Sequence, residues 1–317
     1  MKNLISFPGL GIKEFAVNEK INIFGLDIAW YGIIITCGII LAVTYVLLRS
    51  SKLERVSQDD ILDCALVCIP TAIVGARAYY VLTSLDQYDS FSEAIAIWNG
   101  GLAIYGAVIG GALALLVMAL IKKISIFKIF DLACPAVMIG QIVGRWGNFV
   151  NAEAHGGITD SILRMGLRTE GTLAVYVHPT FLYESVWNLI GFLLINAYYP
   201  KKKYHGEIFF MYISWYGLGR FFIEGLRTDS LYVGNFRISQ VVGLLSFIVG
   251  LAFLIVFYFK RARGRIPLFE VENAVEIGGG LESLETVEEN KVEAVEDTED
   301  TEDISEEKEI QENGKDN

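Results

Sequence analysis

The stretch RISQVVGLLSFIVGLAFLIVFYFKRARGR, residues 237–265, joins a long apolar run to a basic cluster. Its apolar part, residues 237–259, is long enough to cross the hydrocarbon core of a bilayer, which takes about 20 helical residues. The basic residues that follow, from Lys260 to Arg265, are typical of the cytoplasmic end of a transmembrane helix. The stretch therefore predicts a chain that folds within a membrane.

Similar apolar runs recur along the chain, in agreement with its composition. Of its 317 residues, 53% are hydrophobic, and the mean hydropathy is +0.44. A soluble domain of this size does not need so much apolar surface. We predict an all-α membrane protein with seven transmembrane helices in one domain, residues 1–265. The other six runs lie near residues 28–48, 61–82, 101–121, 129–150, 180–198 and 207–225.

The basic residues between the runs predict the orientation. If the spans alternate, 13 Lys and Arg residues follow the first, third, fifth and seventh runs, and fewer lie on the other side. The positive-inside rule then places the N-terminus outside and the C-terminus in the cytoplasm. Residues 151–178, between the fourth and fifth runs, contain glycines and β-branched residues. We expect them to form a small extracytoplasmic insertion that helps to present a peptide.

The net charge of −11 is unevenly distributed. Residues 266–317 hold 19 acidic residues and three lysines, whereas the rest of the chain has an excess of five positive charges. From about Gly278 onward the tail lacks aromatic residues and apolar periodicity, so it cannot bury enough surface to offset the entropy of ordering. We predict a disordered cytoplasmic tail, either a solvating appendage or a docking segment for a basic partner.

The cysteines and histidines indicate no metal or redox chemistry. All four cysteines lie within apolar runs, where we expect them to pack in the core without disulfides. No Cys/His spacing suits a metal, and no Gly-rich nucleotide loop is present. We therefore expect no metal, no cofactor and no nucleic-acid partner. The cysteines are Cys37, Cys64, Cys68 and Cys134.

The fourth run ends in GRWGNFVNAEAHGG, residues 144–157, which is rich in polar side chains. At 1.5 Å per helical residue, Arg77, Arg145 and Arg220 lie roughly 20–24 Å from the cytoplasmic starts of their runs, at the outer leaflet. Ionisable groups at such depth are functional candidates. Two interpretations stay open: an ion-pair lattice, or a phosphate site, because the guanidinium fork matches phosphate oxygens. Three glutamates are the candidate ion-pair partners: Glu153, Glu184 and Glu224.

Residues 144–157 resemble the signature segment of the prolipoprotein diacylglyceryl transferases. The matching positions are Gly144, Arg145, Gly147, Asn148, Phe149, Asn151, Glu153 and Gly156. Further segments in family order are WYG at 30–32, GARAYYVL at 75–82, WNGGLAIYGAVIGG at 98–111, HPTFLYES at 178–185 and YGLGRFFIEGLR at 216–227. The resemblance covers about residues 5–265 and does not include the acidic tail.

The resemblance implies a reaction and its partners. Such enzymes transfer the diacylglyceryl group of phosphatidylglycerol to the lipobox cysteine thiol in the signal peptide of a prolipoprotein. The reaction forms a thioether, releases glycerol 1-phosphate and is the first step of bacterial lipoprotein maturation. The implied location is the bilayer of the bacterial cell membrane, with several passes. The outer-leaflet polar layer is where lipid and exported peptide would meet.

Four residues are candidates for a catalytic role. Arg145 and Arg220 would meet the charge that grows on the phosphate leaving group. Glu153 would either orient Arg145 or accept the thiol proton. Tyr105 stands where many family members carry a histidine proposed as a base, so an essential histidine base is in doubt here. With an ordinary pKa near ~10, tyrosine is a poor base and a good donor at neutral pH.

A second set of residues is expected to bind substrate. The amides of Asn148 and Asn151 suit the headgroup, with helix-end capping as the alternative. Tyrosines could donate to the phosphate or belong to an interfacial belt, and Glu224 with Arg227 could be a structural ion pair. The set is Arg145, Asn148, Asn151, Gly156, Tyr31, Tyr216, Glu184, Glu224 and Arg227. We expect His155, His178 and His205 to serve in loops or in structure rather than in catalysis.

Two other functions use the same features. A transporter or flippase for a phospholipid or an anionic solute would bind its ligand near the midplane and show repeated spans, whereas the polar groups here lie toward one side. Transfer of the phosphatidyl or acyl part would break a different bond. The residues alone do not separate these reactions, and the resemblance favours thioether formation.

Overall fold

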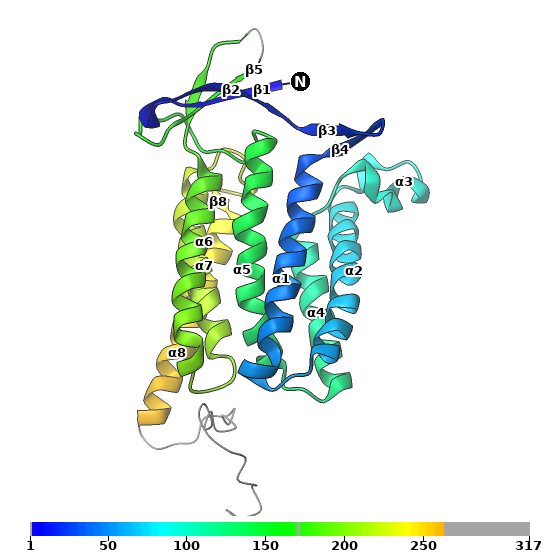
Figure 1. Cartoon of the computed structure of the whole chain (residues 1–317), viewed down its shortest axis with the longest axis vertical. Helices are drawn as coiled ribbons and strands as arrows, with labels where there is room; N and C mark the ends of the chain where they lie inside the picture. Colours follow the sequence, from blue (N-terminus) through cyan, green and yellow to red (C-terminus); the bar gives the residue numbers. More distant parts are fainter. Residues whose placement is uncertain (1, 170–171, 263–317) are drawn as a thin grey trace, which may run out of the picture. The chain divides into compact units, whose positions relative to one another are not determined.

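The computed structural model describes residues 2–169 and 172–262 (Figure 1). Within that part, seven helices have 19 or more residues, and each coincides with one of the predicted apolar runs. The predicted acidic tail lies outside the described residues. The helices are α1 (Trp30–Glu54), α2 (Gln58–Thr83), α4 (Ile104–Lys122), α5 (Ile126–Val150), α6 (Thr180–Tyr198), α7 (Glu207–Leu226) and α8 (Ile238–Ala262).

Five of these helices, α1, α2, α4, α5 and α8, are long and apolar enough to cross a membrane. The other two, α6 and α7, are less apolar because they carry ionisable and amide side chains, among them Glu184, Asn188 and Arg220. The protein is therefore a mostly helical membrane protein with several membrane-spanning helices.

The N-terminal segment forms strands, which the sequence analysis did not predict. A four-stranded antiparallel sheet has the order β2-β1-β5-β6 and combines residues 2–18 with the predicted insertion. Ile5 lies opposite both Phe15 and Leu167 and is fully buried. The predicted insertion thus supplies two of the four strands, and the N-terminal segment supplies the other two. Its strands are β1 (Lys2–Phe7), β2 (Ile12–Asn18), β5 (Met165–Thr169) and β6 (Val175–Val177).

A hairpin of β3 (Lys20–Ile23) and β4 (Leu26–Ala29) leads directly into α1. Its two turn residues, Phe24 and Gly25, have φ values of 51° and 85°, which suits the tight turn of a two-residue hairpin. Lys20 pairs with Ala29 across the hairpin. The Trp30 amide donates to the Glu19 carbonyl oxygen at 3.0 Å. This hydrogen bond holds the start of β3 next to the first turn of α1.

Short elements complete the described part of the chain. A second hairpin, β7 (Tyr232–Val233) and β8 (Phe236–Arg237), precedes α8. The connection between α2 and α4 contains the short helix α3 (Phe91–Ile95) and two 3-10 turns, Leu85–Gln87 and Ile97–Asn99. Further 3-10 turns are Pro8–Leu10 and Tyr199–Lys201.

Glycines allow two helix pairs to approach closely. A Cβ atom at Gly106 in α4 would lie 2.2 Å from the Gly75 carbonyl oxygen in α2. A Cβ atom at Gly217 in α7 would lie 2.5 Å from the Gly243 carbonyl oxygen in α8. The glycines of 106–111 therefore include small-residue contacts between helices, as expected from the sequence.

The sheet and the β3–β4 hairpin lie at one end of the helices, here called the sheet end, and the α1–α2 and α6–α7 connections lie at the other, the basic end (Figure 1). Asp131 is fully buried at the basic end and accepts hydrogen bonds from the amides of Gly206 and Phe209, both at 2.8 Å. Lys202 pairs with Asp131 at 3.1 Å and with Glu54. These contacts fix the α6–α7 connection to α5 and α1.

Candidate active site

The centre of the site is a buried chain of opposite charges near the sheet ends of α5, α6 and α7. Glu184 accepts from Arg145 through Oε1 at 2.6 Å and from Arg220 through Oε2 at 2.9 Å. Arg220 also pairs with Glu224, one turn further along α7, at 2.6 Å. Glu184 and Glu224 are each 2% exposed. Because a buried charge is stable only when paired, these four side chains form one unit, here called the arginine cluster.

The signature segment continues this unit toward the sheet end. Nη1 of Arg145 donates to Asn148 at 3.2 Å, and the amide of Asn148 donates to Glu153 at 2.9 Å. Asn151 also donates to Glu153, at 3.3 Å. Glu153 therefore reaches Arg145 only through Asn148, and the carboxylate directly on Arg145 is Glu184. In the described part of the chain, the side-chain amides of both asparagines donate to Glu153 and cap no backbone group.

Three tyrosines surround the cluster. The Tyr31 ring packs against Gly147, where a Cβ atom would lie 2.7 Å from Cδ2 of the ring, so the signature requires glycine at this position. Tyr31 also interacts electrostatically with Glu153 and Arg145. Tyr105 shares a hydrogen bond with Ser239 at 2.8 Å, which joins α4 to α8.

Tyr216 lies one turn from Arg220 on α7, and its ring stacks on Tyr212 with centroids 5.8 Å apart. Its phenol interacts electrostatically with Glu184, Arg220 and Arg145. The structure thus brings Tyr216 to the arginine cluster, where a phenol can donate to an anion.

Gly156 and Arg227 lie at the edge of the site, where their segments meet. The Gly156 amide donates to the His178 carbonyl oxygen at 2.9 Å, and a Cβ atom there would lie 2.7 Å from Cβ of His178. Arg227 is 4.0 Å from Glu224 but binds Asp229 with two hydrogen bonds of 2.9 and 2.7 Å. Burial acts to raise the pKa of Asp229, but the Arg227 pair outweighs it and the pKa is lowered. Asp229 lies two residues beyond Arg227 and was not predicted from the sequence.

Arg77 does not join the arginine cluster. Its guanidinium donates to four carbonyl oxygens of the α2–α4 connection and faces the Tyr88 ring. It also lines a separate cavity of about 280 Å³. Arg77 therefore orders a loop, and its donors are engaged away from the predicted phosphate site. The four acceptors are Glu93 (2.8 Å), Ala94 (2.8 Å), Gly100 (2.5 Å) and Gly101 (3.0 Å).

The three histidines lie outside the cluster. His155 contacts the carbonyl oxygen of Gly156 at 3.0 Å, and His178 contacts the Tyr183 hydroxyl at 3.3 Å. His205 is at the basic end, 3.6 Å from Glu54. None of these contacts connects a histidine to Arg145 or Arg220.

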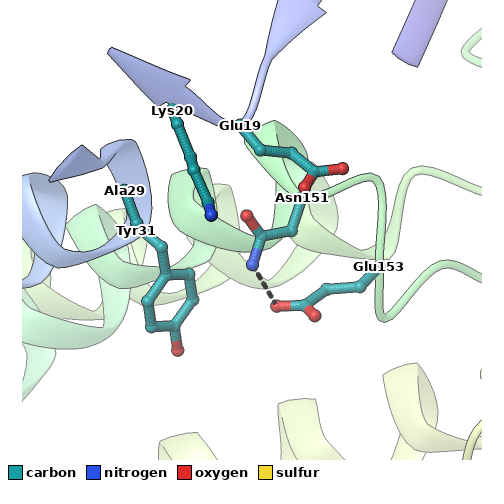
Figure 2. A pocket seen from close by; sticks show the side chains of 6 residues that line it. All are labelled: Glu19, Lys20, Ala29, Tyr31, Asn151 and Glu153. Atoms are coloured by element: carbon teal, nitrogen blue, oxygen red, sulfur yellow. Dashed lines mark hydrogen bonds between the residues drawn. The ribbon is translucent and has the colours of Figure 1, made fainter. Parts of the chain in front are cut away.

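A cavity of about 420 Å³ lies between the β3–β4 hairpin and the end of α5 (Figure 2). Figure 2 shows the Lys20 side chain extending from its strand toward Asn151 and Tyr31. Tyr31, Asn151 and Glu153 were proposed from the sequence, whereas the three lining residues in or next to the hairpin were not, because they belong to no recognisable motif. The lining residues are Glu19, Lys20, Ala29, Tyr31, Asn151 and Glu153.

The helices define an integral membrane protein, and the arginine cluster places two largely buried cations near one end of them. The chain belongs to the prolipoprotein diacylglyceryl transferase family, whose model matches residues 19–256. It is therefore a transferase. The family resemblance noted in the sequence is confirmed.

Several relatives carry the name phosphatidylglycerol–prolipoprotein diacylglyceryl transferase. One from Clostridium perfringens (numbered 1) is 43% identical over 258 residues, covering 78% of this chain and 97% of the relative. One from Streptococcus pneumoniae serotype 4 is 45% identical over 257 residues, covering 78% and 96%. One from Listeria welshimeri is 41% identical, covering 78% and 91%.

Proposed function

We propose that this protein transfers the diacylglyceryl group of phosphatidylglycerol to the lipobox cysteine of a prolipoprotein, releasing glycerol 1-phosphate. The names of its relatives support these substrates. The observation that carries the mechanism is the pair of arginines held by one buried carboxylate, Glu184.

The reaction breaks the bond between the diacylglycerol methylene carbon and the phosphate oxygen. A bond forms between that carbon and the cysteine sulfur, which attacks as thiolate after losing its proton. The electron pair of the broken bond leaves with glycerol phosphate. Catalysis therefore requires fixed cations where negative charge increases on the leaving group.

Arg145 and Arg220 are suited to this task. Each guanidinium has five N–H donors, and Glu184 uses only one donor of each. Since their positions are set before substrate arrives, little reorganisation is needed when the charge develops. Tyr216 lies beside them as a further donor, and Tyr105 is fixed by Ser239 as another.

The thiol proton passes to water. Glu153 is an exposed carboxylate, unlike Glu184 and Glu224, and we propose that it orients the amides of Asn148 and Asn151 toward the lipid headgroup. Glu184, with both oxygens on arginines, is a positioning residue. The Gly156 junction and the Arg227–Asp229 pair hold the signature segment against the end of α7.

The same reasoning gives the proposed membrane arrangement. All seven long helices span the bacterial cell membrane, and the less apolar α6 and α7 do so because the arginine cluster faces other helices rather than lipid. The concentration of lysines and arginines supports a cytoplasmic basic end. The sheet end, with the site, then faces outward, where exported prolipoproteins arrive. A cluster within two helical turns of one end does not favour a transporter.

The test uses purified protein in phosphatidylglycerol vesicles with a lipobox peptide, and mass spectrometry follows the peptide. We expect a diacylglyceryl adduct on the cysteine. Arg145→Ala should lower the rate by about 10²- to 10³-fold, the usual loss for one such contact. Arg168→Ala is the matched control, because Arg168 pairs with Glu14 on the exposed sheet, and it should stay within about twofold.

The outcomes separate the alternatives. Lipid that remains intact with a folded wild-type protein would overturn the transferase and favour transport. An adduct that carries the phosphate would indicate transfer of the phosphatidyl part instead. An undiminished rate in Arg145→Ala would show that Arg145 is only a structural ion-pair partner.

A further inference from the structure

We propose that the cavity between the β3–β4 hairpin and the end of α5 binds the glycerol headgroup of the lipid, and that Lys20 is a headgroup-binding residue that selects for its hydroxyls. This inference rests on the proposed function. It adds Lys20, together with Glu19, to the site, and it assigns the cavity a substrate class, a phosphate-linked diol.

The backbone places Lys20 over the cavity. Lys20 pairs with Ala29 in the hairpin register, and Ala29 directly precedes the first turn of α1, which carries Tyr31. The hydrogen bond from Trp30 to Glu19 prevents the strand from sliding along the helix start. Figure 2 shows the Lys20 side chain directed at Asn151 across the cavity, with Tyr31 beside it.

The polar groups of the cavity match a neutral diol. A hydroxyl both donates and accepts, whereas a carboxylate only accepts and an ammonium only donates. Glu19 and Glu153 supply acceptors, and Lys20 supplies three donors. Within residues 2–169 and 172–262, Lys20 forms no ion pair. Two carboxylates would repel a second phosphate, and the Lys20 ammonium would repel an amine headgroup.

The cavity lies on the headgroup side of the arginine cluster. Asn151 is six residues beyond Arg145, which corresponds to about 9 Å along the helix toward the sheet end. Tyr31 interacts electrostatically with both Arg145 and the cavity residue Glu153. A phosphate held by Arg145 and Arg220 would therefore extend its glycerol into the cavity, while its diacylglycerol part points the opposite way.

The same geometry implies that the lipobox cysteine thiol of the peptide does not bind in this cavity. Displacement at a tetrahedral carbon requires the sulfur to approach opposite the departing phosphate oxygen. Since the cavity lies on the side of the leaving group, it receives glycerol phosphate as that group departs. The thiol approaches the carbon from the other direction.

The test compares two lipids in vesicles of otherwise equal composition. Phosphatidyl-1-propanol keeps the phosphate, the acyl chains and three headgroup carbons but lacks both hydroxyls. The wild-type protein should show kcat/KM at least about 10-fold higher for phosphatidylglycerol, as expected for loss of a hydrogen bond to a charged group. In Lys20→Met this ratio should fall toward one, because methionine keeps the side-chain length without the ammonium.

Lys13→Met is the matched control. Lys13 is exposed on β2 of the same N-terminal segment and does not line the cavity, so its variant should keep the wild-type ratio. Lys20→Arg, which retains a donating cation, should restore part of the preference. Glycerol 1-phosphate should inhibit the wild type more strongly than inorganic phosphate does, and this difference should shrink in Lys20→Met.

Failures of the two proposals can be told apart. No adduct from either lipid would overturn the proposed function itself. Equal kcat/KM for both lipids in an active wild type would overturn the headgroup site alone. A wild-type preference that persists in Lys20→Met would remove Lys20 from that site.

Discussion

At the scale of single residues, the site depends on one carboxylate that serves two arginines. Arg145 and Arg220 come from different helices, and Glu184 from a third keeps their guanidinium groups close despite their like charge. An arginine pair without this carboxylate would be repelled and would lose its fixed position. In the proposed mechanism, Glu184 therefore keeps the two cations positioned for the substrate.

We expect Glu184→Gln to affect both stability and catalysis. The amide keeps the shape but leaves the arginine cluster with one unbalanced positive charge, which should destabilise the fold by about 3–5 kcal/mol, as for other broken buried pairs. A melting curve in detergent measures this, and peptide modification should fall by roughly 10-fold or more. Glu14→Gln, at the exposed partner of Arg168, is the control and should change neither value appreciably. A stable, fully active Glu184→Gln would contradict the positioning role.

The sequence identified the charged residues of the site better than their partners. Arg145, Arg220, Glu184 and Glu224 stand out because ionisable groups in apolar runs are costly. Which carboxylate meets which arginine depends on helix packing, so Glu184 rather than Glu153 on Arg145 could not be foreseen. Asp229 and Lys20 lie in ordinary polar surroundings, and nothing in their local sequence marks them.

At the scale of elements, two helix pairs of the bundle pack closely because glycines lie at their points of closest approach. Gly106→Ala should force α2 and α4 apart, since its Cβ atom would lie 2.2 Å from a backbone oxygen that cannot rotate away. We expect a loss of about 1–3 kcal/mol, the usual effect of overpacking, measured as a lower melting temperature in detergent.

Gly140→Ala provides the comparison in α5. Nothing lies within 4 Å of a Cβ atom at this position, so the variant should lose no stability. Equal melting temperatures for the two variants would show that α2 and α4 adjust without cost.

Helices were the predictable elements of this fold. The run near 129–150 became α5 (Ile126–Val150), and the run near 180–198 became α6 with the same bounds. Membrane-spanning runs are long and apolar, so they are evident in the sequence. Strands β1 and β5 were missed because each is short, and they pair with each other across more than 150 residues of sequence.

At the scale of the whole molecule, the sheet ties the start of the chain to the middle. Ile5 is fully buried in a core with Phe7, Met165, Val177 and Phe181, the last of which belongs to α6. The sheet is therefore packed on the same helix that carries Glu184. Stability of the N-terminal strands and order at the site should be coupled.

Ile5→Ala tests this coupling. Removal of a buried isoleucine side chain should destabilise the sheet by about 2–5 kcal/mol and open residues 151–178 to protease. Limited proteolysis followed by mass mapping reports the cleavage sites. Ile12→Ala, at a half-exposed position of β2, should leave the digestion pattern of the wild type. If Ile5→Ala is cleaved no faster, the sheet is not a single unit.

The pairing of β1 with β5 also sets an order of events during biosynthesis. Ribosomes add about 5–20 residues per second, so roughly 10–30 s pass between synthesis of β1 and synthesis of β5. Glu19 and Lys20, at the start of the β3–β4 hairpin, are made early, together with the beginning of α1. The end of α5, which completes the cavity that they line, is translated only later in that interval. The proposed headgroup cavity is therefore assembled late, after α1 to α5 have been made, and we expect that a nascent chain cannot hold lipid there before then.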